Sequence, residues 1–234
     1  MKLENKKIVV TGAGSGIGRE VVLALLKKNN KVLAVDLRAE SLDALKKEVG
    51  ESENLTIHTL DIFDKTAVEK LAADNSEIDA LINNAGIIQP FVKVKDLDYS
   101  AIEKVMGVNF YGTLYMTKSF LPLLLKRPEA YIVNVSSMGG FLPVPGQSIY
   151  GASKAAVKLF TEGLFAELKD TSVHVSVVFP GATSTNITKN SGVEAQKIEG
   201  GKEYKTLPAS EAARLIVSGI EKNQPQIFLG SDCK

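Results

Sequence analysis

Short apolar runs alternate with amphipathic stretches along almost the whole chain, and this alternation limits the folds open to it. The apolar runs are nearly continuous and rich in β-branched residues, as in KIVVTG, KVLAVDL and HVSVVFPG. Such runs are typical of strands buried on both faces of a parallel sheet. Between them lie stretches with helical spacing of apolar residues, such as GREVVLALLKKNN. The repeated order of strand and helix predicts right-handed crossovers and a doubly wound α/β fold.

The number of runs predicts a seven-stranded parallel sheet with helices on both faces. Six runs precede the helical segment ASEAARLIVSGIEK, and QIFLG after it supplies the seventh strand. The chain has 234 residues, of which 44% are hydrophobic, and no Pro/Gly/Ser-rich linker divides it. We therefore predict a single domain over residues 1–234.

Composition excludes several classes of protein and favours a cytoplasmic location. The net charge of +1 gives no reason to expect a nucleic-acid partner. The start, MKLENKK, lacks the apolar core of a signal peptide, and FLPLLL is too short to span a membrane. The only cysteine, Cys233, excludes an internal disulfide and favours a reducing compartment. His58 and His174 have no second ligand at metal spacing, so we expect no metal site.

A glycine-rich loop, TGAGSGIG, lies between the first predicted strand and the first predicted helix. In such a loop Gly12 allows a tight turn, Gly16 lets the backbone approach a pyrophosphate, and Gly18 lets helix and strand pack closely. The helix N-terminus would then offer free N–H groups to the phosphates. The alternative is a turn that only needs a positive φ. The position between strand and helix favours the phosphate loop.

A tyrosine and a lysine four residues apart follow a pair of serines in SSMGGFLPVPGQSIYGASKAA. This spacing is about one helical turn, so Tyr150 and Lys154 share a face. Free tyrosine, with a pKa near ~10, is a poor base at neutral pH. A nearby ammonium group lowers that pKa, so Tyr150 could exchange a proton with a substrate alcohol. The alternative is a surface pair of side chains. Neither serine lies in the Gly-x-Ser-x-Gly motif of a hydrolase.

These motifs together resemble the short-chain dehydrogenase/reductase family. The resemblance covers nearly the whole chain and rests on TGAGSGIG, NNAG, VNFYG, the second serine of SSMGG, YGASK and PGATST. It implies a Rossmann-type fold and hydride transfer between a nicotinamide dinucleotide and a secondary alcohol or ketone. It also implies a catalytic set of Asn109, Ser137, Tyr150 and Lys154. In that set Ser137 holds the substrate oxygen, Lys154 also binds the nicotinamide ribose, and Asn109 anchors a water that leads to Lys154.

The resemblance further implies a set of cofactor contacts in the loops that follow the strands. Asp61 and Ile62 would flank the adenine, and the small residues after the fourth strand would let the backbone approach the adenosine. The whole predicted set is Gly12, Ser15, Gly16, Ile17, Gly18, Asp36, Leu37, Asp61, Ile62, Asn84, Ala85, Gly86, Tyr150, Lys154, Pro180, Gly181, Thr183 and Thr185.

The acid at the end of the second strand favours NAD over NADP. The carboxylate of Asp36 can bind both adenosine ribose hydroxyls, and it would repel a 2′-phosphate. A turn-forming or capping aspartate is the alternative. Ser15 and Leu37 stand where proteins that accept the phosphate usually have a basic residue. Arg38 could swing round toward the pocket, but we favour a solvated side chain at the start of the next helix. About 1.4 kcal/mol of repulsion already gives tenfold discrimination.

The long polar segment over about 184–206 is expected to cover the substrate cleft as a lid, unless it is a surface insertion. The substrate is expected to be an uncharged or partly apolar alcohol or ketone. Candidate apolar walls include Met138, Phe141 and Phe179.

Two helical segments, SAIEKVMGVNFYGTLYMTKSFLPLLL and YGASKAAVKLFTEGLFAEL, are apolar on more than one face and need a second surface to cover them. The resemblance implies that they form a homodimer or homotetramer. The alternative is burial under a C-terminal tail, if one follows this sequence.

Two other functions are alternatives to hydride transfer. A catalytically silent dinucleotide-binding regulator or scaffold would not need all four residues of the catalytic set. A sugar-nucleotide epimerase of the extended branch of the family is disfavoured by the chain length and by the glycine spacing.

Overall fold

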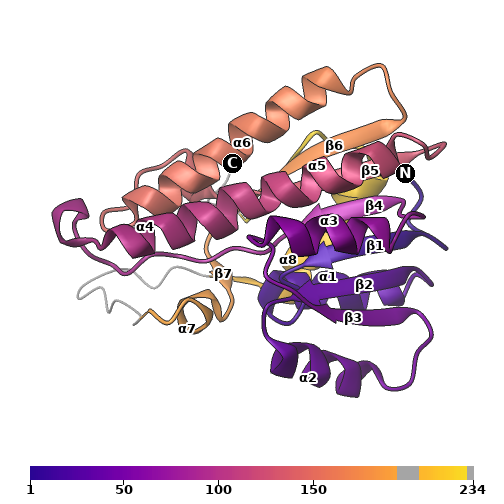
Figure 1. Ribbon diagram of the computed structural model, residues 1–234, viewed down its shortest axis with the longest axis horizontal. Helices are drawn as coiled ribbons and strands as arrows, with labels where there is room; N and C mark the ends of the chain where they lie inside the picture. The colour runs from indigo at the N-terminus through magenta and orange to yellow at the C-terminus, as the bar shows by residue number, and fades with distance from the viewer. Residues whose placement is uncertain (194–205, 231–234) are drawn as a thin grey trace.

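Seven parallel strands form a central sheet between two layers of helices (Figure 1). The computed structural model describes residues 1–193 and 206–230. The strand order is β3-β2-β1-β4-β5-β6-β9. The predicted doubly wound, seven-stranded sheet is therefore confirmed. The strands are β1 (Lys7–Thr11), β2 (Lys31–Asp36), β3 (Leu55–Thr59), β4 (Ala80–Asn83), β5 (Ala130–Val135), β6 (Val173–Pro180) and β9 (Gln226–Leu229).

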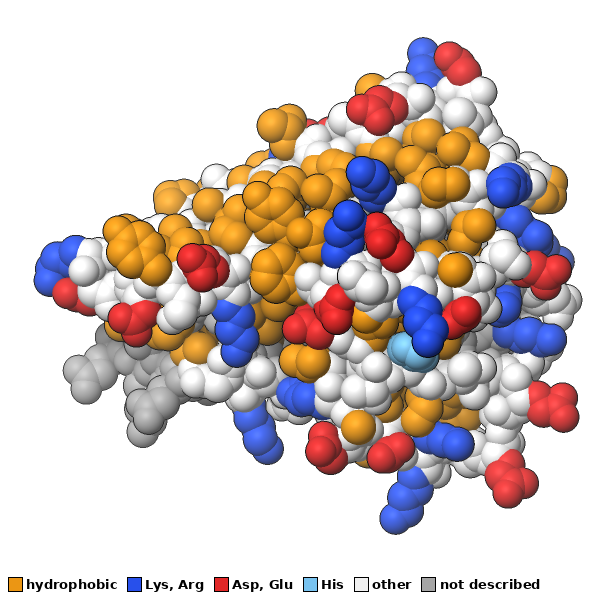
Figure 2. All heavy atoms as spheres, in the orientation of Figure 1, with side chains coloured by type: hydrophobic (Ala, Val, Ile, Leu, Met, Phe, Trp, Pro, Cys, Tyr) orange, Lys and Arg blue, Asp and Glu red, His pale blue; other side chains and the backbone are white. Residues whose placement is uncertain are grey.

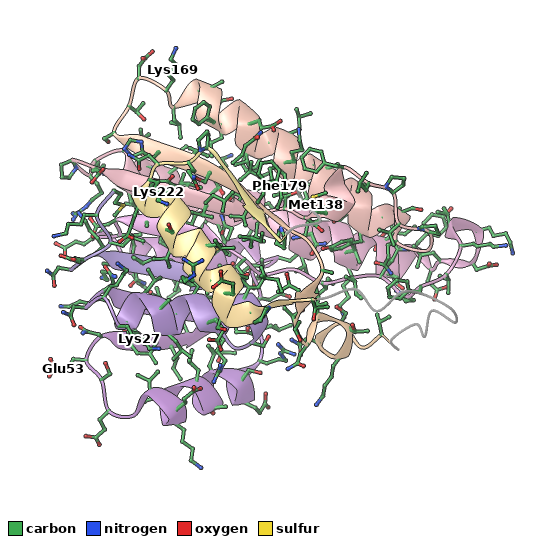
Figure 3. The ribbon with its side chains drawn as sticks, turned by 180° about the vertical axis from the view of Figure 1, so that it is seen from behind. Lys27, Glu53, Met138, Lys169, Phe179 and Lys222 are labelled. Atoms are coloured by element: carbon green, nitrogen blue, oxygen red, sulfur yellow. The ribbon has the colours of Figure 1, made fainter. Side chains whose placement is uncertain are left out.

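Helices cover both faces of the sheet, as expected when right-handed crossovers run in both directions from the point where the strand order reverses. One layer holds α1 (Gly16–Leu26), α2 (Ala39–Val49) and α8 (Ala209–Glu221). The other holds α3 (Lys65–Ala73), α5 (Thr113–Leu124) and α6 (Ser148–Glu167), with α4 (Tyr99–Met106) beside them. Figure 1 is viewed from the side of α4, α5 and α6, and Figure 3 from the side of α8.

The strands are apolar throughout because both of their faces are buried. In β1, for example, Ile8 and Val10 belong to the core under α1, α2 and α8, whereas Val9 belongs to the core under α3, α5 and α6. All three side chains are fully buried. This double burial explains why the sequence shows continuous apolar runs rather than alternation.

The strand order reverses between β1 and β4, because β1 pairs with β2 on one side and with β4 on the other. The loops after these two strands therefore diverge at the carboxyl edge of the sheet. In open α/β sheets a ligand-binding crevice forms at this point.

Several short elements were not predicted. A π-helical segment, Gly107–Gly112, joins α4 to α5, and short 3-10 turns occupy Val94–Asp96 and Met138–Gly140. Beyond the sheet, β7 (Thr183–Ser184) pairs with β8 (Leu207–Pro208), and α7 (Ile187–Asn190) follows β7.

The described residues include only part of the predicted lid, and they do not test the predicted single domain. Residues 194–205 of the predicted lid lie outside the described residues. That residues 1–234 form one domain stays a prediction. Among the helices of the described residues, none combines the length and the apolarity that a membrane crossing requires.

Candidate active site

A cavity of about 380 Å³ opens at the carboxyl edge of the sheet, at the point where the strand order reverses. Every predicted cofactor contact except Gly18 lines it, and so does Ser137. The structure therefore brings together residues from the loops that follow β1, β2, β3, β4, β5 and β6.

The glycine loop has the conformation that close backbone approach needs. Gly12 has φ 64° and Gly16 has φ 53°, both in the left-handed region that favours glycine. A Cβ atom on Gly12 would lie 2.8 Å from the Cα of Ala85, and one on Gly18 would collide with the carbonyl oxygen of Gly12. Ser15, the N-cap of α1, makes no side-chain cap. The N–H groups there can bind phosphate, so these residues fit a dinucleotide.

Thr11 and Asn84 join the two diverging loops, and only the second of them was predicted. The Thr11 hydroxyl accepts hydrogen bonds from the backbone N–H groups of Asn84 and Ala85, both at 3.1 Å. The Asn84 amide donates to the carbonyl oxygens of Thr11 and Gly12. The Asn84 side chain therefore holds the glycine loop in place.

The predicted position of Arg38 is wrong. Instead of lying in solvent, its guanidinium turns back over the cavity, donates to the Ser15 hydroxyl at 3.2 Å and lies 3.7 Å from the Asp36 carboxylate. The carboxylate attracts it, and the buried Asp36 also accepts from the backbone N–H groups of Gly14 and Arg38. Leu37 is 61% exposed. The pocket for the adenosine ribose thus contains both an acid and a base.

Ser137, Tyr150 and Lys154 also line the cavity. Ser137 follows β5, and its hydroxyl hydrogen-bonds the Tyr150 phenol and accepts from the N–H of Gly139. Lys154 lies one turn after Tyr150 on α6, is 3% exposed, and donates to the carbonyl oxygen of Val135 at 2.9 Å. The neighbouring Ser136 hydroxyl points into the fold and donates to the Lys154 carbonyl oxygen.

Burial shifts the pKa values of both ionisable groups in this cluster. It raises the pKa of Tyr150, and the hydrogen bond from Ser137 opposes this rise. Burial also lowers the pKa of Lys154, from 10.5 to about 8. That Lys154 lowers the pKa of Tyr150 stays a prediction. The Lys154 ammonium is desolvated and turned toward the Val135 carbonyl oxygen.

Asn109 lies behind the cavity and does not line it. The side chain is fully buried in the π-helical segment. Its Oδ1 accepts from the N–H of Ile87 at 2.8 Å, and its Nδ2 donates to the Ile87 carbonyl oxygen and the Ser153 hydroxyl, both at 2.9 Å. Asn109 thus clamps the loop after β4. Its predicted role in anchoring a water stays a prediction.

The described part of the predicted lid contacts the glycine loop and the loop after β4. The Asn190 amide donates to the Ser15 hydroxyl at 2.8 Å, and the Ser191 hydroxyl accepts from the N–H of Ile88 at 3.0 Å. Asn186, Ile187 and Asn190 line the cavity but were not predicted. Their polar segment carries no motif from which a role could be read.

The fold and the cavity define a dinucleotide-binding α/β protein. Residues 6–196 match the sequence model of the short chain dehydrogenase family. A 3-oxoacyl-[acyl-carrier-protein] reductase of Thermotoga maritima is 37% identical over 196 residues, which cover 81% of this chain and 78% of the relative. The chain therefore belongs to the short-chain dehydrogenase/reductase family, an oxidoreductase family acting on alcohol or carbonyl groups.

Solved structures share both the fold and this family. A short chain dehydrogenase from Burkholderia cenocepacia, in complex with NADP, has a TM-score of 0.84 and 29% identity, covering 100% of this chain and 91% of that one. A second, from Burkholderia phymatum in complex with NAD, has a TM-score of 0.85 and 25% identity, covering 97% and 90%.

Proposed function

We propose that the protein is an NAD-dependent oxidoreductase that converts a secondary alcohol to a ketone or the reverse, with Tyr150 as general acid/base. The observation that carries the proposal is the convergence of Ser137, Tyr150 and Lys154 on the cavity that the glycine loop also lines. Nothing in the fold or among the relatives favours a catalytically silent protein instead.

Each of the three side chains has a distinct task in this proposal. Bound NAD would accept the hydride from the carbinol carbon, or supply it in the reverse direction. Tyr150 takes the hydroxyl proton as the carbonyl forms, or returns a proton to the developing alkoxide. Ser137 donates a hydrogen bond to the substrate oxygen and stabilises its charge. The positive charge of Lys154 favours the phenolate when a substrate and cofactor complete the site.

The raised pKa of Tyr150 means that the phenol needs a positive charge bound close to it before it can act as a base. Without such a charge, burial keeps the phenol protonated. A positive charge close to the ring favours the phenolate. Tyr150 should therefore become a competent base only after the cofactor binds.

The proposal is tested by Tyr150→Phe, which removes the transferable proton and leaves the ring. With a panel of alcohols and ketones followed by nicotinamide absorbance, the variant should lose at least about a hundredfold in kcat, within the range of general acid–base catalysis. Its NADH dissociation constant should change little. A variant that retained most of the wild-type kcat would refute the role of Tyr150.

The preference for NAD rests on the buried Asp36 carboxylate, which would lie against a 2′-phosphate. The guanidinium of Arg38 opposes this effect, because it could bind the same phosphate. We propose that Asp36 dominates, since its charge is buried whereas the Arg38 side chain is 35% exposed. Similar solved structures are complexes with NADP in one case and with NAD in another, so family membership alone does not decide the cofactor.

The substrate is proposed to be an uncharged, partly apolar ketone or alcohol. Phe141, Leu142 and Val144, in the loop before α6, are each 45–58% exposed. Phe179 is fully buried between the rings of Phe141 and Phe228, so it supports this loop and does not form a wall. Met138 and Phe179 both lie toward the carboxyl edge of the sheet (Figure 3). A relative that reduces 3-oxoacyl groups is in keeping with a partly apolar substrate.

We also propose a homodimer or homotetramer in the cytoplasm. Apolar side chains form a band over α4, α5 and α6 (Figure 2). The band includes Tyr99, Tyr111, Leu125, Leu159 and Phe165, of which Tyr99 is 84% and Leu159 is 70% exposed. Exposed apolar surface of this kind marks an interaction site. The low cysteine content supports the cytoplasmic location.

A further inference from the structure

The first turn of α6 contains Tyr150 and needs hydrogen-bond acceptors from outside the helix. The first N–H groups of any helix have no helical carbonyl to bind. In α6 the N–H of Gly151 is bonded to the Gln147 carbonyl oxygen at 2.8 Å, but the N-cap Gln147 makes no side-chain cap. The N–H groups of Ile149 and Tyr150 must therefore find another acceptor.

Gln89, in the loop after β4, supplies that acceptor. Its Oε1 accepts from the N–H of Ile149 at 2.8 Å and from the N–H of Tyr150 at 3.1 Å. Its Nε2 donates to the Gly146 carbonyl oxygen at 2.9 Å. The Gln89 side chain is fully buried. One amide thus caps the helix and fixes the loop that leads into it.

Other contacts complete the attachment of this turn. The Gln147 amide donates to the Gln89 carbonyl oxygen at 2.8 Å. The loop after β4 and the loop before α6 therefore each donate a hydrogen bond to the other. A Cβ atom on Gly151 would lie 2.8 Å from the Gly139 carbonyl oxygen, which shows how closely the helix packs on the turn after Ser137. The first turn is therefore held by Gln89 and by the backbone that positions Ser137.

We propose that Gln89 is a positioning residue for Tyr150: it serves as a helix cap supplied by a distant loop and fixes the phenol relative to Ser137 and Lys154. This inference rests on the proposed function. Gln89 is not among the residues that line the cavity, so it acts through the backbone of Tyr150. A displacement of about 1 Å at a reacting group can cost about a hundredfold in rate.

The first test is Gln89→Met, which keeps a similar volume and removes both the acceptor and the donor. We expect kcat to fall about tenfold to a hundredfold, while the NADH dissociation constant stays within about threefold of wild type, since the glycine loop is untouched. This separation between turnover and cofactor binding is the signature of a positioning role.

The second test is Gln89→Glu, which should rescue activity in a pH-dependent manner. A protonated carboxyl group keeps the acceptor for the helix and can donate to the Gly146 carbonyl oxygen. The ionised group has no donor and sets a negative charge against that oxygen. Burial raises the pKa of the introduced group. We expect the ratio of the variant's kcat to the wild-type kcat, measured at the same pH, to be close to one at low pH and to fall as pH rises.

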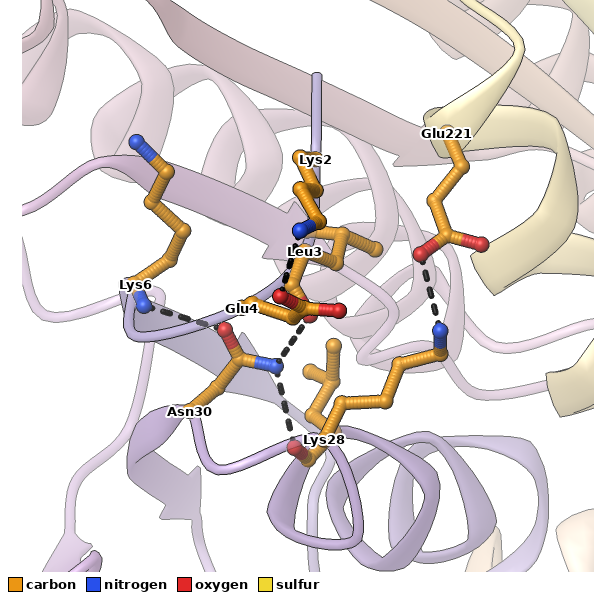
Figure 4. Close-up of polar contacts among 8 residues, drawn as sticks. Lys2, Leu3, Glu4, Lys6, Lys28, Asn30 and Glu221 are labelled. Carbon is orange, nitrogen blue, oxygen red and sulfur yellow. Dashed lines mark hydrogen bonds and ion pairs between the residues drawn. The ribbon is translucent and has the colours of Figure 1, made fainter.

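Asn30 provides a matched control at the other edge of the sheet (Figure 4). It too is fully buried: its Oδ1 accepts from the N–H of Lys6, and its Nδ2 donates to the carbonyl oxygens of Leu3 and Leu25, all at 3.0 Å. Asn30→Leu removes three side-chain hydrogen bonds, as many as Gln89→Met does. It should lower Tm but leave kcat per folded enzyme unchanged.

The inference is overturned if Gln89→Met keeps kcat within twofold of wild type, or if its NADH affinity falls in proportion to kcat. An equal loss of kcat in Asn30→Leu would also overturn it, because general destabilisation would then explain both. Tyr150→Phe separates this inference from the proposed function. If Tyr150→Phe is inactive while Gln89→Met is active, only the inference fails; if Tyr150→Phe is active, the proposed function fails.

Discussion

Replacing the buried Lys154 by methionine should abolish turnover and yet stabilise the protein. Lys154 is 3% exposed, and burial lowers its pKa from 10.5 to about 8. A protonated lysine in this site is therefore destabilising, because its ammonium has lost its water. Methionine has a similar length and no charge, so it removes this penalty.

The size of the effect follows from the shift. A fall from 10.5 to about 8, at 1.36 kcal/mol per pKa unit, corresponds to a penalty of about 3 kcal/mol at neutral pH. The variant loses the hydrogen bond from Lys154 to Val135, which contributes about 1 kcal/mol. Lys154→Met should therefore raise the free energy of unfolding by about 2 kcal/mol. In a chain of this size that raises Tm by about 4–8 °C.

The pH dependence distinguishes this cause from better packing. Between pH 8 and 10.5 the unfolded lysine keeps its proton whereas the folded one loses it, so the wild type gains stability as pH rises. The advantage of the variant should be full below pH 8 and shrink toward pH 10. Burial raises the pKa of Tyr150 only in the folded protein, so Tyr150 ionises in the unfolded state near pH 10; this effect is common to the wild type and the variant and cancels from the difference between them.

The assay is thermal and urea unfolding without cofactor at pH 7 and at pH 10. Lys169→Met is the control, because Lys169 is exposed beyond the end of α6 (Figure 3). It should change stability by less than about 0.5 kcal/mol at either pH. A Lys154→Met variant less stable than wild type at pH 7, or an advantage that does not shrink at pH 10, would refute the reasoning.

Three further predictions concern the cofactor, the loop after β4 and assembly. Asp36→Ala should shrink the preference for NAD and Arg38→Leu should enlarge it, measured as kcat/KM for both cofactors on one substrate; no response to either change would contradict the proposed balance. Gly86→Ala places a Cβ atom 3.0 Å from the Lys154 Nζ, so kcat should fall about tenfold or more, and an unchanged kcat would show that the lysine can move freely. Leu159→Arg should convert the oligomer to monomers, as measured by light scattering. Glu51→Arg, a change at an exposed residue beyond α2, should leave the oligomer intact. A wild-type protein of monomer mass at micromolar concentration would refute the assembly.

The sheet could be predicted from sequence because burial on both faces leaves a direct trace in each strand. Ile8, Val9 and Val10 are apolar in succession because the two cores take alternate side chains. The glycine loop was equally readable, since the positive φ of Gly12 and Gly16 restricts the residue type there. In both cases the constraint, burial on both faces or a positive φ, acts on neighbouring residues and so leaves a local pattern in the sequence.

The side-chain contacts of the site could not be read in this way. Arg38 was expected in solvent, but it turns back because Asp36 and Ser15 provide partners from two different loops. Thr11 stands at the start of the glycine motif and Gln89 stands in no motif, but in neither case does the sequence show what the side chain binds; only the paired loops show it. Such contacts depend on tertiary structure, so the sequence around each residue gives no sign of them.

The loop after β4 explains how these separate contacts act together. Its Asn84 bonds the glycine loop, its Gly86 lies against the Lys154 ammonium, its Ile87 is clamped by Asn109, and its Gln89 caps the helix of Tyr150. None of these four needs to transfer a proton. Because each fixes a different part of the cavity, a change in the course of this loop would displace the phosphate site, the lysine and the tyrosine at once. The loop after β4 therefore sets the relative positions of the phosphate site, Lys154 and Tyr150, on which the proposed chemistry depends.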